Sequence, residues 1–259
     1  MSNEPTKDPK DYSREIQWLI EEKYQGMMNE AVQADIERIK QGEPVAYVIG
    51  FVDFLGTKID LSERPLIPRV ETELWVEQII KEINKDQDAT KEIRCLDIFA
   101  GSGCIGVAVL KHAPRATVDF VDVDTKAIKQ IEINCKLNNI DASRFKIIES
   151  DMFNELNNSY DYIFSNPPYI KEGKKSEVQD SVLAYEPHGA LFGGPRGLRY
   201  IKAFLDQVKK YLKENGKIYM EFGADQKEEI EKIVKEQGFS KVEFYQDQFK
   251  KWRSVRIEP

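Results

Sequence analysis

The clearest chemical character in the sequence belongs to four residues that suit recognition of a flat amino group: Asn166, Pro167, Pro168 and Tyr169. They follow the apolar run Tyr160 to Phe164, a predicted strand, so they lie at the strand end where open α/β sheets bind ligands. The prolines lack an N–H and stiffen the backbone, which leaves a wall of carbonyl acceptors, one side-chain amide and an aromatic face. The motif therefore predicts chemistry on an amide or an exocyclic amine, with a plain proline-stiffened turn as the alternative.

A glycine-rich turn lies upstream of this motif, between a predicted strand at 93–99 and a predicted helix at 103–112. A strand, a small-residue turn and a helix N-terminus form the first unit of a nucleotide-binding sheet. The next predicted strand ends at Asp122, roughly 20 residues beyond Gly101, which is the spacing at which an acid reaches ribose hydroxyls. A purely structural glycine turn is the alternative. The turn and the acid before it comprise Asp97, Phe99, Ala100, Gly101, Ser102 and Gly103.

Further motifs occur in a fixed order along most of the chain. They are Gly42 to Tyr47 (GEPVAY), Ile67 to Glu73 (IPRVETE), Ser165 to Ile170 (SNPPYI) and Glu186 to Leu191 (EPHGAL) with Gly193 and Gly194. From about Gly42 to the C-terminus the sequence resembles the HemK/PrmC family. The resemblance implies a class I S-adenosylmethionine-dependent methyltransferase that modifies the side-chain amide nitrogen (N5) of a glutamine in the Gly-Gly-Gln motif of peptide chain release factors.

The pattern of apolar residues predicts an α/β fold with a mostly parallel sheet, because strands and helices alternate from residue 93 onward. The last two strands form a terminal antiparallel hairpin, as the resemblance also implies, in a Rossmann-like sheet of seven strands. The predicted strands are 93–99, 116–121, 145–149, 160–165, 216–222, 241–246 and 252–257. The predicted helices are 71–84, 103–112, 125–138, 197–213 and 225–237.

The N-terminal part of the chain has a different pattern. Residues 1–10 are polar and predicted to fray, and Tyr12 to Lys40 fits one or two amphipathic helices. Val45 to Leu61 alternates strand-like stretches with glycines, which predicts a hairpin linker. The chain is therefore divided into a short helical segment (1–42), the hairpin linker (43–68) and the methyltransferase domain (69–259), with a polar loop at 84–91.

The four-residue wall would hold the substrate amide in the reaction that the resemblance implies. The side-chain oxygen of Asn166 and the carbonyl of Pro167 accept its two N–H groups, and Tyr169 stacks on its face. Further predicted substrate contacts are Arg69, Pro168 and Glu186. The alternatives are a proline-started helix for Arg69 and an exposed turn for Glu186.

The cofactor contacts follow the same resemblance. Asp97 is expected at the amino end of S-adenosylmethionine and Asp122 at its ribose hydroxyls, while Gly101 and Gly103 allow close backbone approach. Residues expected near the adenine are Asp151, Met152 and Phe153, for which a turn cap (Asp151) and a core position (Phe153) are the alternatives. The remaining predicted cofactor contacts are Phe99, Ala100, Ser102 and Asn166.

Composition excludes several other classes of protein. The 259 residues are 41% hydrophobic and 32% charged, with no apolar stretch of membrane-spanning length and no signal peptide at the start. Three cysteines without C-x-x-C spacing and two histidines predict neither a disulfide framework nor a metal site. The net charge of −7 disfavours nucleic acid as the main partner. We therefore expect a cytoplasmic monomer with no membrane partner.

Several functions share this wall of acceptors. A glutamine methyltransferase of a ribosomal protein would use the same residues as one of release factors. An adenine N6-methyltransferase of DNA or RNA also acts on a flat –NH2 group, but the acidic composition and the Ile-Pro-Arg and Glu-Pro-His motifs weigh against it. A non-catalytic binding module would not need the wall.

Overall fold

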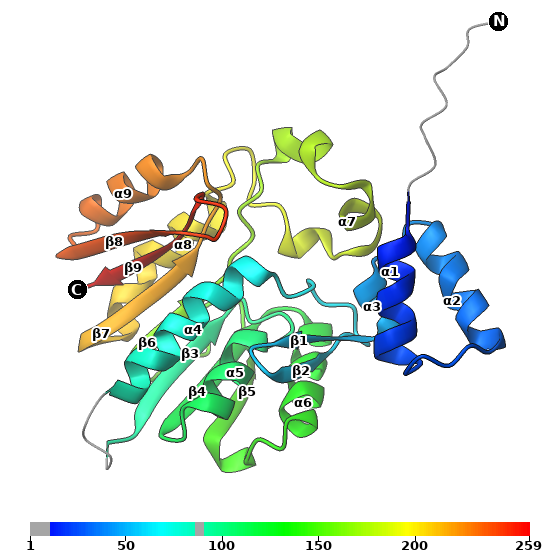
Figure 1. Ribbon diagram of the computed structural model, residues 1–259. Coiled ribbons are helices and arrows are strands. Elements are labelled where there is room, and N and C mark those ends of the chain that lie inside the picture. The colour runs from blue at the N-terminus through cyan, green and yellow to red at the C-terminus, as the bar shows by residue number, and fades with distance from the viewer. Residues whose placement is uncertain (1–10, 86–90) are drawn as a thin grey trace, which may run out of the picture.

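The computed structural model describes residues 11–85 and 91–259, so the predictions for residues 1–10 and most of the loop at 84–91 lie outside the described residues. The main sheet follows the order β5-β4-β3-β6-β7-β9-β8 (Figure 1). β3 to β7 run parallel, whereas β9 is antiparallel to β7 and β8, which confirms the predicted parallel sheet and terminal hairpin. The strands are β3 (Ile93–Ile98), β4 (Ala116–Asp122), β5 (Phe145–Glu149), β6 (Tyr160–Ser165), β7 (Leu212–Glu221), β8 (Lys241–Gln246) and β9 (Trp252–Glu258).

The order of the strands reverses beside β3. The chain moves from β3 outward to β4 and β5, then returns to the other side of β3 with β6. Such a switch point opens a crevice at the carboxyl ends of the strands. The last residues of the two central strands, Ile98 and Ser165, are register partners. The segments that begin with Phe99 and Asn166 therefore leave the sheet side by side.

Helices cover both faces of the sheet because alternate residues of a strand point to opposite faces. Cys95 packs into the core beneath α4, α5 and α6, whereas Leu96 packs into the core beneath α8 and α9. These helices are α4 (Val70–Lys85), α5 (Cys104–His112), α6 (Thr125–Leu137), α8 (Arg199–Val208) and α9 (Lys227–Glu236). Within the described ranges, no helix combines the length and the apolar character that crossing a membrane requires.

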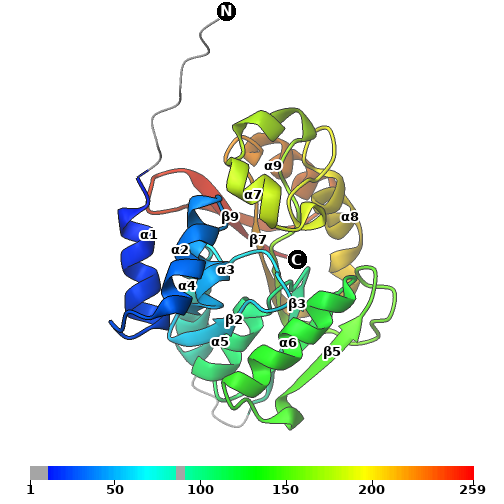
Figure 2. The same cartoon turned by 90° about the vertical axis from the view of Figure 1, so that its right-hand side faces the viewer.

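The N-terminal helices gather at one side of the molecule (Figure 1, Figure 2). They are α1 (Ser13–Trp18), which continues as a π-helical turn at Leu19–Lys23, α2 (Glu30–Lys40) and α3 (Val45–Ile49). They enclose a small core of their own, made of Leu19, Val32, Ile36, Ile39 and Val48. Asn29 begins α2 by accepting a hydrogen bond from the Val32 N–H at 3.2 Å. The predicted amphipathic helices are thus confirmed.

The predicted hairpin is confirmed in the second half of the linker and is wrong for the first half. Strands β1 (Phe51–Phe54) and β2 (Thr57–Asp60) form the expected hairpin. The first part of the linker is instead the helix α3, which Pro44 precedes and Gly50 ends with a left-handed φ of 97°. A short apolar run between a proline and a glycine fits either structure, and packing of Val48 into the N-terminal core selects the helix.

The boundary between α8 and β7 also differs from the prediction. The sequence predicts a helix that reaches 213, but α8 ends at Val208, and β7 begins at Leu212 instead of at 216. The ring of Tyr211 stacks on Phe153 with centroids 4.6 Å apart, so contacts with a distant segment fix the turn. The segment between β6 and α8 carries a further short helix, α7 (Asp180–Tyr185).

Candidate active site

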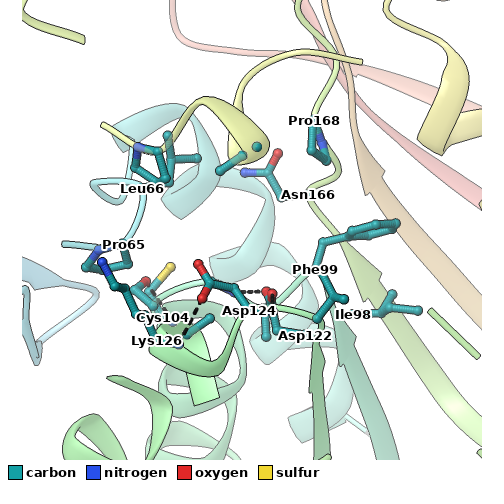
Figure 3. Close-up of a pocket in the computed structure, with 18 of the residues that line it drawn as sticks. Pro65, Leu66, Ile98, Phe99, Cys104, Asp122, Asp124, Lys126, Asn166 and Pro168 are labelled. Atoms are coloured by element: carbon teal, nitrogen blue, oxygen red, sulfur yellow. Dashed lines mark hydrogen bonds between the residues drawn. The ribbon is translucent and has the colours of Figure 1, made fainter. Parts of the chain in front are cut away.

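A cavity of about 510 Å³ opens at the switch point of the sheet (Figure 3). Its walls come from the glycine turn after β3, the acid at the end of β4, the segment after β6, residues 63–69 and the segment at 185–190. The predicted site residues that line it are Arg69, Phe99, Ala100, Gly101, Ser102, Asp122, Asp151, Met152, Asn166, Pro168 and Glu186. The predicted residues outside its lining are Asp97, Gly103, Pro167, Phe153 and Tyr169.

The glycine turn is shaped by backbone that ordinary residues rarely adopt. Phe99, Gly101 and Gly103 have φ values of 60°, 55° and 75°. The turn is fastened to the next strand because the Gly101 N–H donates to Oδ2 of Asp122 at 2.8 Å, and the Asp124 N–H donates to Oδ1 at 3.0 Å. Burial raises the pKa of Asp122, against the effect of these hydrogen bonds. Asp122 thus holds the turn and faces the cavity at once.

Asp97 lies fully buried beneath the turn. Its Oδ2 accepts the Gly106 N–H at 2.9 Å, while Oδ1 has no hydrogen-bond partner among residues 11–85 and 91–259. Burial raises the pKa of Asp97 to about 8, against the effect of the Gly106 hydrogen bond. A buried acid with one open acceptor is costly, and it suits a ligand that brings a cationic group.

We expect Asp97→Asn to stabilise the ligand-free protein by roughly 2–4 kcal/mol at pH 7. The unfolded chain loses the Asp97 proton near pH 4, but the folded protein keeps it up to about pH 8. Wild-type stability therefore falls through this window as the pH rises, and the neutral amide lacks that loss. Thermal unfolding from pH 4 to 8 should show an advantage of the variant that grows with pH. A constant difference across the window would contradict the buried, neutral Asp97.

The segment after β6 is held firmly at its backbone. Ile170 donates to the Leu191 carbonyl and accepts from the Gly193 N–H, both at 2.9 Å. The buried Gln226 donates from Nε2 to the Tyr169 carbonyl at 3.0 Å. A Cβ on Gly193 would lie 2.4 Å from the Pro168 carbonyl oxygen, so glycine is needed for this close approach. The side chain of Asn166 points into the cavity (Figure 3).

The structure places two predicted contacts away from the cavity. Tyr169 directs its hydroxyl to the buried Glu221, at 3.0 Å from Oε1, instead of presenting its ring as a cavity wall. Phe153 is buried and stacks on Phe204 and Tyr211. Contact of Phe153 with adenine therefore does not fit the arrangement, because its ring is buried in the core. The ring of Tyr169 is partly buried and packs against the same core, so its stacking on a substrate amide stays a prediction.

Arg69 and Glu186 pair with each other across the cavity wall. Nη2 of Arg69 lies 2.7 Å from Oε1 of Glu186, and the Ile67 N–H donates to Oε2 at 3.0 Å. The Glu186 side chain is 1% exposed and that of Arg69 is 35% exposed, so the ion pair joins the start of the methyltransferase domain to the segment after α7 in a half-buried setting. The alternative of an exposed turn for Glu186 is wrong. The motifs indicate both residues as site residues but do not predict their contact.

Three amide side chains, two on α6 and one at its C-cap, are structural partners of the site that the sequence patterns did not indicate. Asn134 accepts the Asp60 N–H and donates to the Ser102 carbonyl of the glycine turn, both at 2.8 Å. Gln130 and Asn138, one turn before and after it, also bind linker backbone: Gln130 accepts the Glu63 N–H, and Asn138 donates to the Lys58 carbonyl. Their spacing of four residues on one helix face was the available signal. These hydrogen bonds hold the linker against the glycine turn.

Comparison with known proteins agrees with this geometry. Residues 72–187 match the model of the methyltransferase small domain. The release factor glutamine methyltransferase of Lactococcus lactis subsp. lactis is 34% identical over 223 residues, which cover 86% of this chain and 80% of that protein. The enzyme of the same name from Thermodesulfovibrio yellowstonii is 36% identical over 217 residues, with 83% and 76% covered. A crystal structure of a methyltransferase from Pyrococcus furiosus shares the fold, with a TM-score of 0.56, 18% identity and coverage of 88% and 98%.

A parallel sheet of this order, closed by an antiparallel hairpin and carrying a glycine turn at its switch point, is the fold of class I S-adenosylmethionine-dependent methyltransferases, and this protein is such an enzyme. Within that class, the similarity to the curated relatives extends over most of both chains. The chain belongs to the release factor glutamine methyltransferase family, as the HemK/PrmC resemblance predicted.

Proposed function

We propose that the enzyme transfers a methyl group from S-adenosylmethionine to the side-chain amide nitrogen of the glutamine in the Gly-Gly-Gln motif of a peptide chain release factor. The observation that carries this proposal is the placement of Asn166 in the cavity directly beside the glycine turn, because Ile98 and Ser165 are register partners. The names of the curated relatives support the choice of substrate.

The residues around the glycine turn fit the cofactor. The open acceptor of Asp97 suits the cationic amino end, and Asp122 keeps lone pairs for ribose hydroxyls beyond the two N–H groups it already accepts. We place Asp151 and Met152 near the adenine, since both line the cavity and follow Ser150, whose N–H donates to the Asp122 carbonyl at 2.9 Å. When bound, S-adenosylmethionine supplies a methyl group that is already activated by its sulfonium.

The remaining task of the protein is to orient the amide nitrogen. Its lone pair is delocalised into the carbonyl, so the nitrogen is a poor nucleophile. Acceptance of both N–H groups, by the Asn166 side chain and the Pro167 carbonyl, would favour a pyramidal nitrogen with its lone pair directed at the methyl group. Orientation of this kind can contribute roughly 7–11 kcal/mol to lowering a barrier. The product can lose its proton afterwards, so a strong general base is not needed.

The substrate assignment predicts a mass increase of about 14 Da, one methylene, on the Gly-Gly-Gln peptide of a release factor. The protein is incubated with S-adenosylmethionine and a purified release factor, and the digest is analysed by mass spectrometry. A factor with alanine in place of the glutamine is the control and should stay unmodified. Methylation of a ribosomal protein or of an adenine oligonucleotide, with the release factor untouched, would contradict the proposal.

We also propose that the enzyme acts as a cytoplasmic monomer on a protein and not on nucleic acid. The net charge of −7 supports a protein partner, and release factors act where translation takes place. We retain three units, 1–42, 43–68 and 69–259. The separate core of the N-terminal helices supports this division, although Val48 of α3 shares that core and extends the first unit toward Gly50.

A further inference from the structure

The hydroxyl of Tyr169 belongs to a buried network centred on Glu221, at the end of β7. Oε1 of Glu221 accepts the Tyr169 hydroxyl at 3.0 Å, and Oε2 accepts the Thr72 hydroxyl at 2.6 Å and the Trp75 indole N–H at 3.1 Å. Arg253 of β9 donates to the Tyr169 hydroxyl oxygen at 3.4 Å. The tyrosine hydroxyl is thus engaged both as donor and as acceptor.

Because Glu221 is buried, its hydrogen bonds hold their partners in fixed positions. Glu221 is 1% exposed, and a buried carboxylate is tolerated only when hydrogen bonds and opposite charge compensate it. Its compensation comes from three elements, since Thr72 and Trp75 lie on α4, Tyr169 follows β6 and Arg253 lies on β9. Movement of the tyrosine hydroxyl would leave an oxygen of Glu221 without a partner, so the tyrosine is held in one orientation.

The same tyrosine is also fixed at its backbone. Its carbonyl accepts the Gln226 amide at 3.0 Å, and the bare Cα of Gly197 packs against it, where a Cβ would approach to 2.1 Å. Only two prolines of fixed φ separate Tyr169 from Asn166. A change in the position of Tyr169 therefore passes directly to the Asn166 side chain and the Pro167 carbonyl.

We propose that Glu221 is a positioning residue for methyl transfer, acting through the hydroxyl of Tyr169 to set the place of the Asn166 and Pro167 acceptors. The proposal rests on the proposed function, because those acceptors are its amide-binding groups. In this proposal Tyr169 holds the segment after β6 in place. The proposal also explains the presence of both Arg69 and Thr72 in the Ile67–Glu73 motif. Arg69 pairs with Glu186, and Thr72 joins α4 to Glu221.

The test uses Tyr169→Phe, Glu221→Gln and the double variant in the full chain. Each single variant should lower kcat for release factor methylation at least about tenfold, because geometry at the acceptors governs the rate. The double variant should fall little below the worse single variant, since both changes break one contact. The Kd for S-adenosylmethionine, measured by calorimetry, should stay within about threefold of wild type. Full turnover of Tyr169→Phe, or independent effects that multiply, would overturn the proposal.

Tyr219→Phe is the matched control. The Tyr219 hydroxyl donates to Oε2 of Glu82 at 2.6 Å, so it is also a largely buried tyrosine–glutamate bond between β7 and α4. Among residues 11–85 and 91–259, its hydroxyl has no hydrogen bond to the segment after β6. Its loss should lower stability to a similar degree and leave kcat within about twofold of wild type. An equal loss of kcat in the control would reduce Glu221 to a structural role and overturn the proposal.

A second readout does not depend on activity. Backbone amide hydrogen exchange at Asn166, Tyr169 and Ile170 should become at least about tenfold faster in Tyr169→Phe and Glu221→Gln, but not in Tyr219→Phe. If the wild type fails to methylate a release factor, the proposed function is wrong, yet this exchange still decides whether Glu221 fixes the segment. A loss of turnover without faster exchange would assign the hydroxyl to the substrate and overturn the proposal.

Discussion

Asn166→Ala is expected to lower kcat by about 10²–10³, by analogy with the loss of one preorganised polar group in other enzymes. The proposed hydrogen bond from the substrate amide to the Asn166 oxygen strengthens as the nitrogen becomes nucleophilic, and interactions that grow toward the transition state act on turnover more than on binding. Single-turnover kinetics with a release factor measure the change. Calorimetry should give a Kd for S-adenosylmethionine within about threefold of wild type, because Asp97, Asp122 and the glycine turn remain.

Asn166→Asp is the control for this prediction. It keeps the shape and an acceptor but adds a negative charge beside the sulfonium, so its kcat should lie between those of wild type and Asn166→Ala. Activity in the aspartate variant with almost none in the alanine variant would support the role of the oxygen as acceptor. Turnover of a folded Asn166→Ala near that of wild type would mean that the motif is only a stiff turn.

Gly197→Ala should be the most damaging single methyl addition near the site. Gly197 has a φ of 68°, and its Cβ would lie 2.1 Å from the Tyr169 carbonyl oxygen and 2.5 Å from Nε2 of Gln226. The methyl group must displace that carbonyl from its hydrogen bond. We expect the free energy of unfolding to fall by more than about 3 kcal/mol, which exceeds the cost of about 1–2 kcal/mol for a left-handed residue alone. Urea unfolding followed by fluorescence measures the loss.

Gly194→Ala separates the cost of a left-handed backbone from the cost of the steric clash. Gly194 has a φ of 83°, but within the described part of the chain its Cβ would meet only the Cβ of Arg199, at an ordinary 3.5 Å. The free energy of unfolding of this variant should therefore fall only by about 1–2 kcal/mol, the cost of a left-handed residue, and most of the turnover should remain. Equal losses of stability in the two variants would show that close packing on the Tyr169 carbonyl is unimportant.

Local sequence patterns predicted those elements whose boundaries are set by nearby residues. β5 and β6 occupy the predicted ranges, because a polar or turn-forming residue limits each apolar run. The position of the Asn166 motif at the end of β6, next to the glycine turn, follows from alternation of strands and helices together with the switch-point rule. The candidate site could therefore be located from sequence at the level of its loops.

Direction of individual side chains could not be predicted in the same way. Glu221 binds Thr72 and Tyr169 across 149 and 52 positions of sequence, and no local pattern encodes such a meeting. The sequence predicts stacking for Tyr169 because the hydrogen-bond partners of its hydroxyl, Glu221 and Arg253, lie far away along the chain. Phe153 lies two residues after Asp151, a predicted cofactor contact, but its ring packs against Tyr211 in the core. Tertiary contacts thus place Phe153 in the interior and set the direction of the Tyr169 hydroxyl.

The amides of Asn134 on α6 and of Asn138 at its C-cap have a consequence for the linker hairpin itself. Asn138 contacts both the N–H and the carbonyl of Lys58, and Asn134 does the same for Asp60. These backbone groups form the outer edge of β2, which a two-stranded sheet would otherwise leave open to pair with a strand of another molecule. The helix side chains take the place of a third strand. A short hairpin can thus precede the cavity-lining residues 63–69 without serving as a template for aggregation.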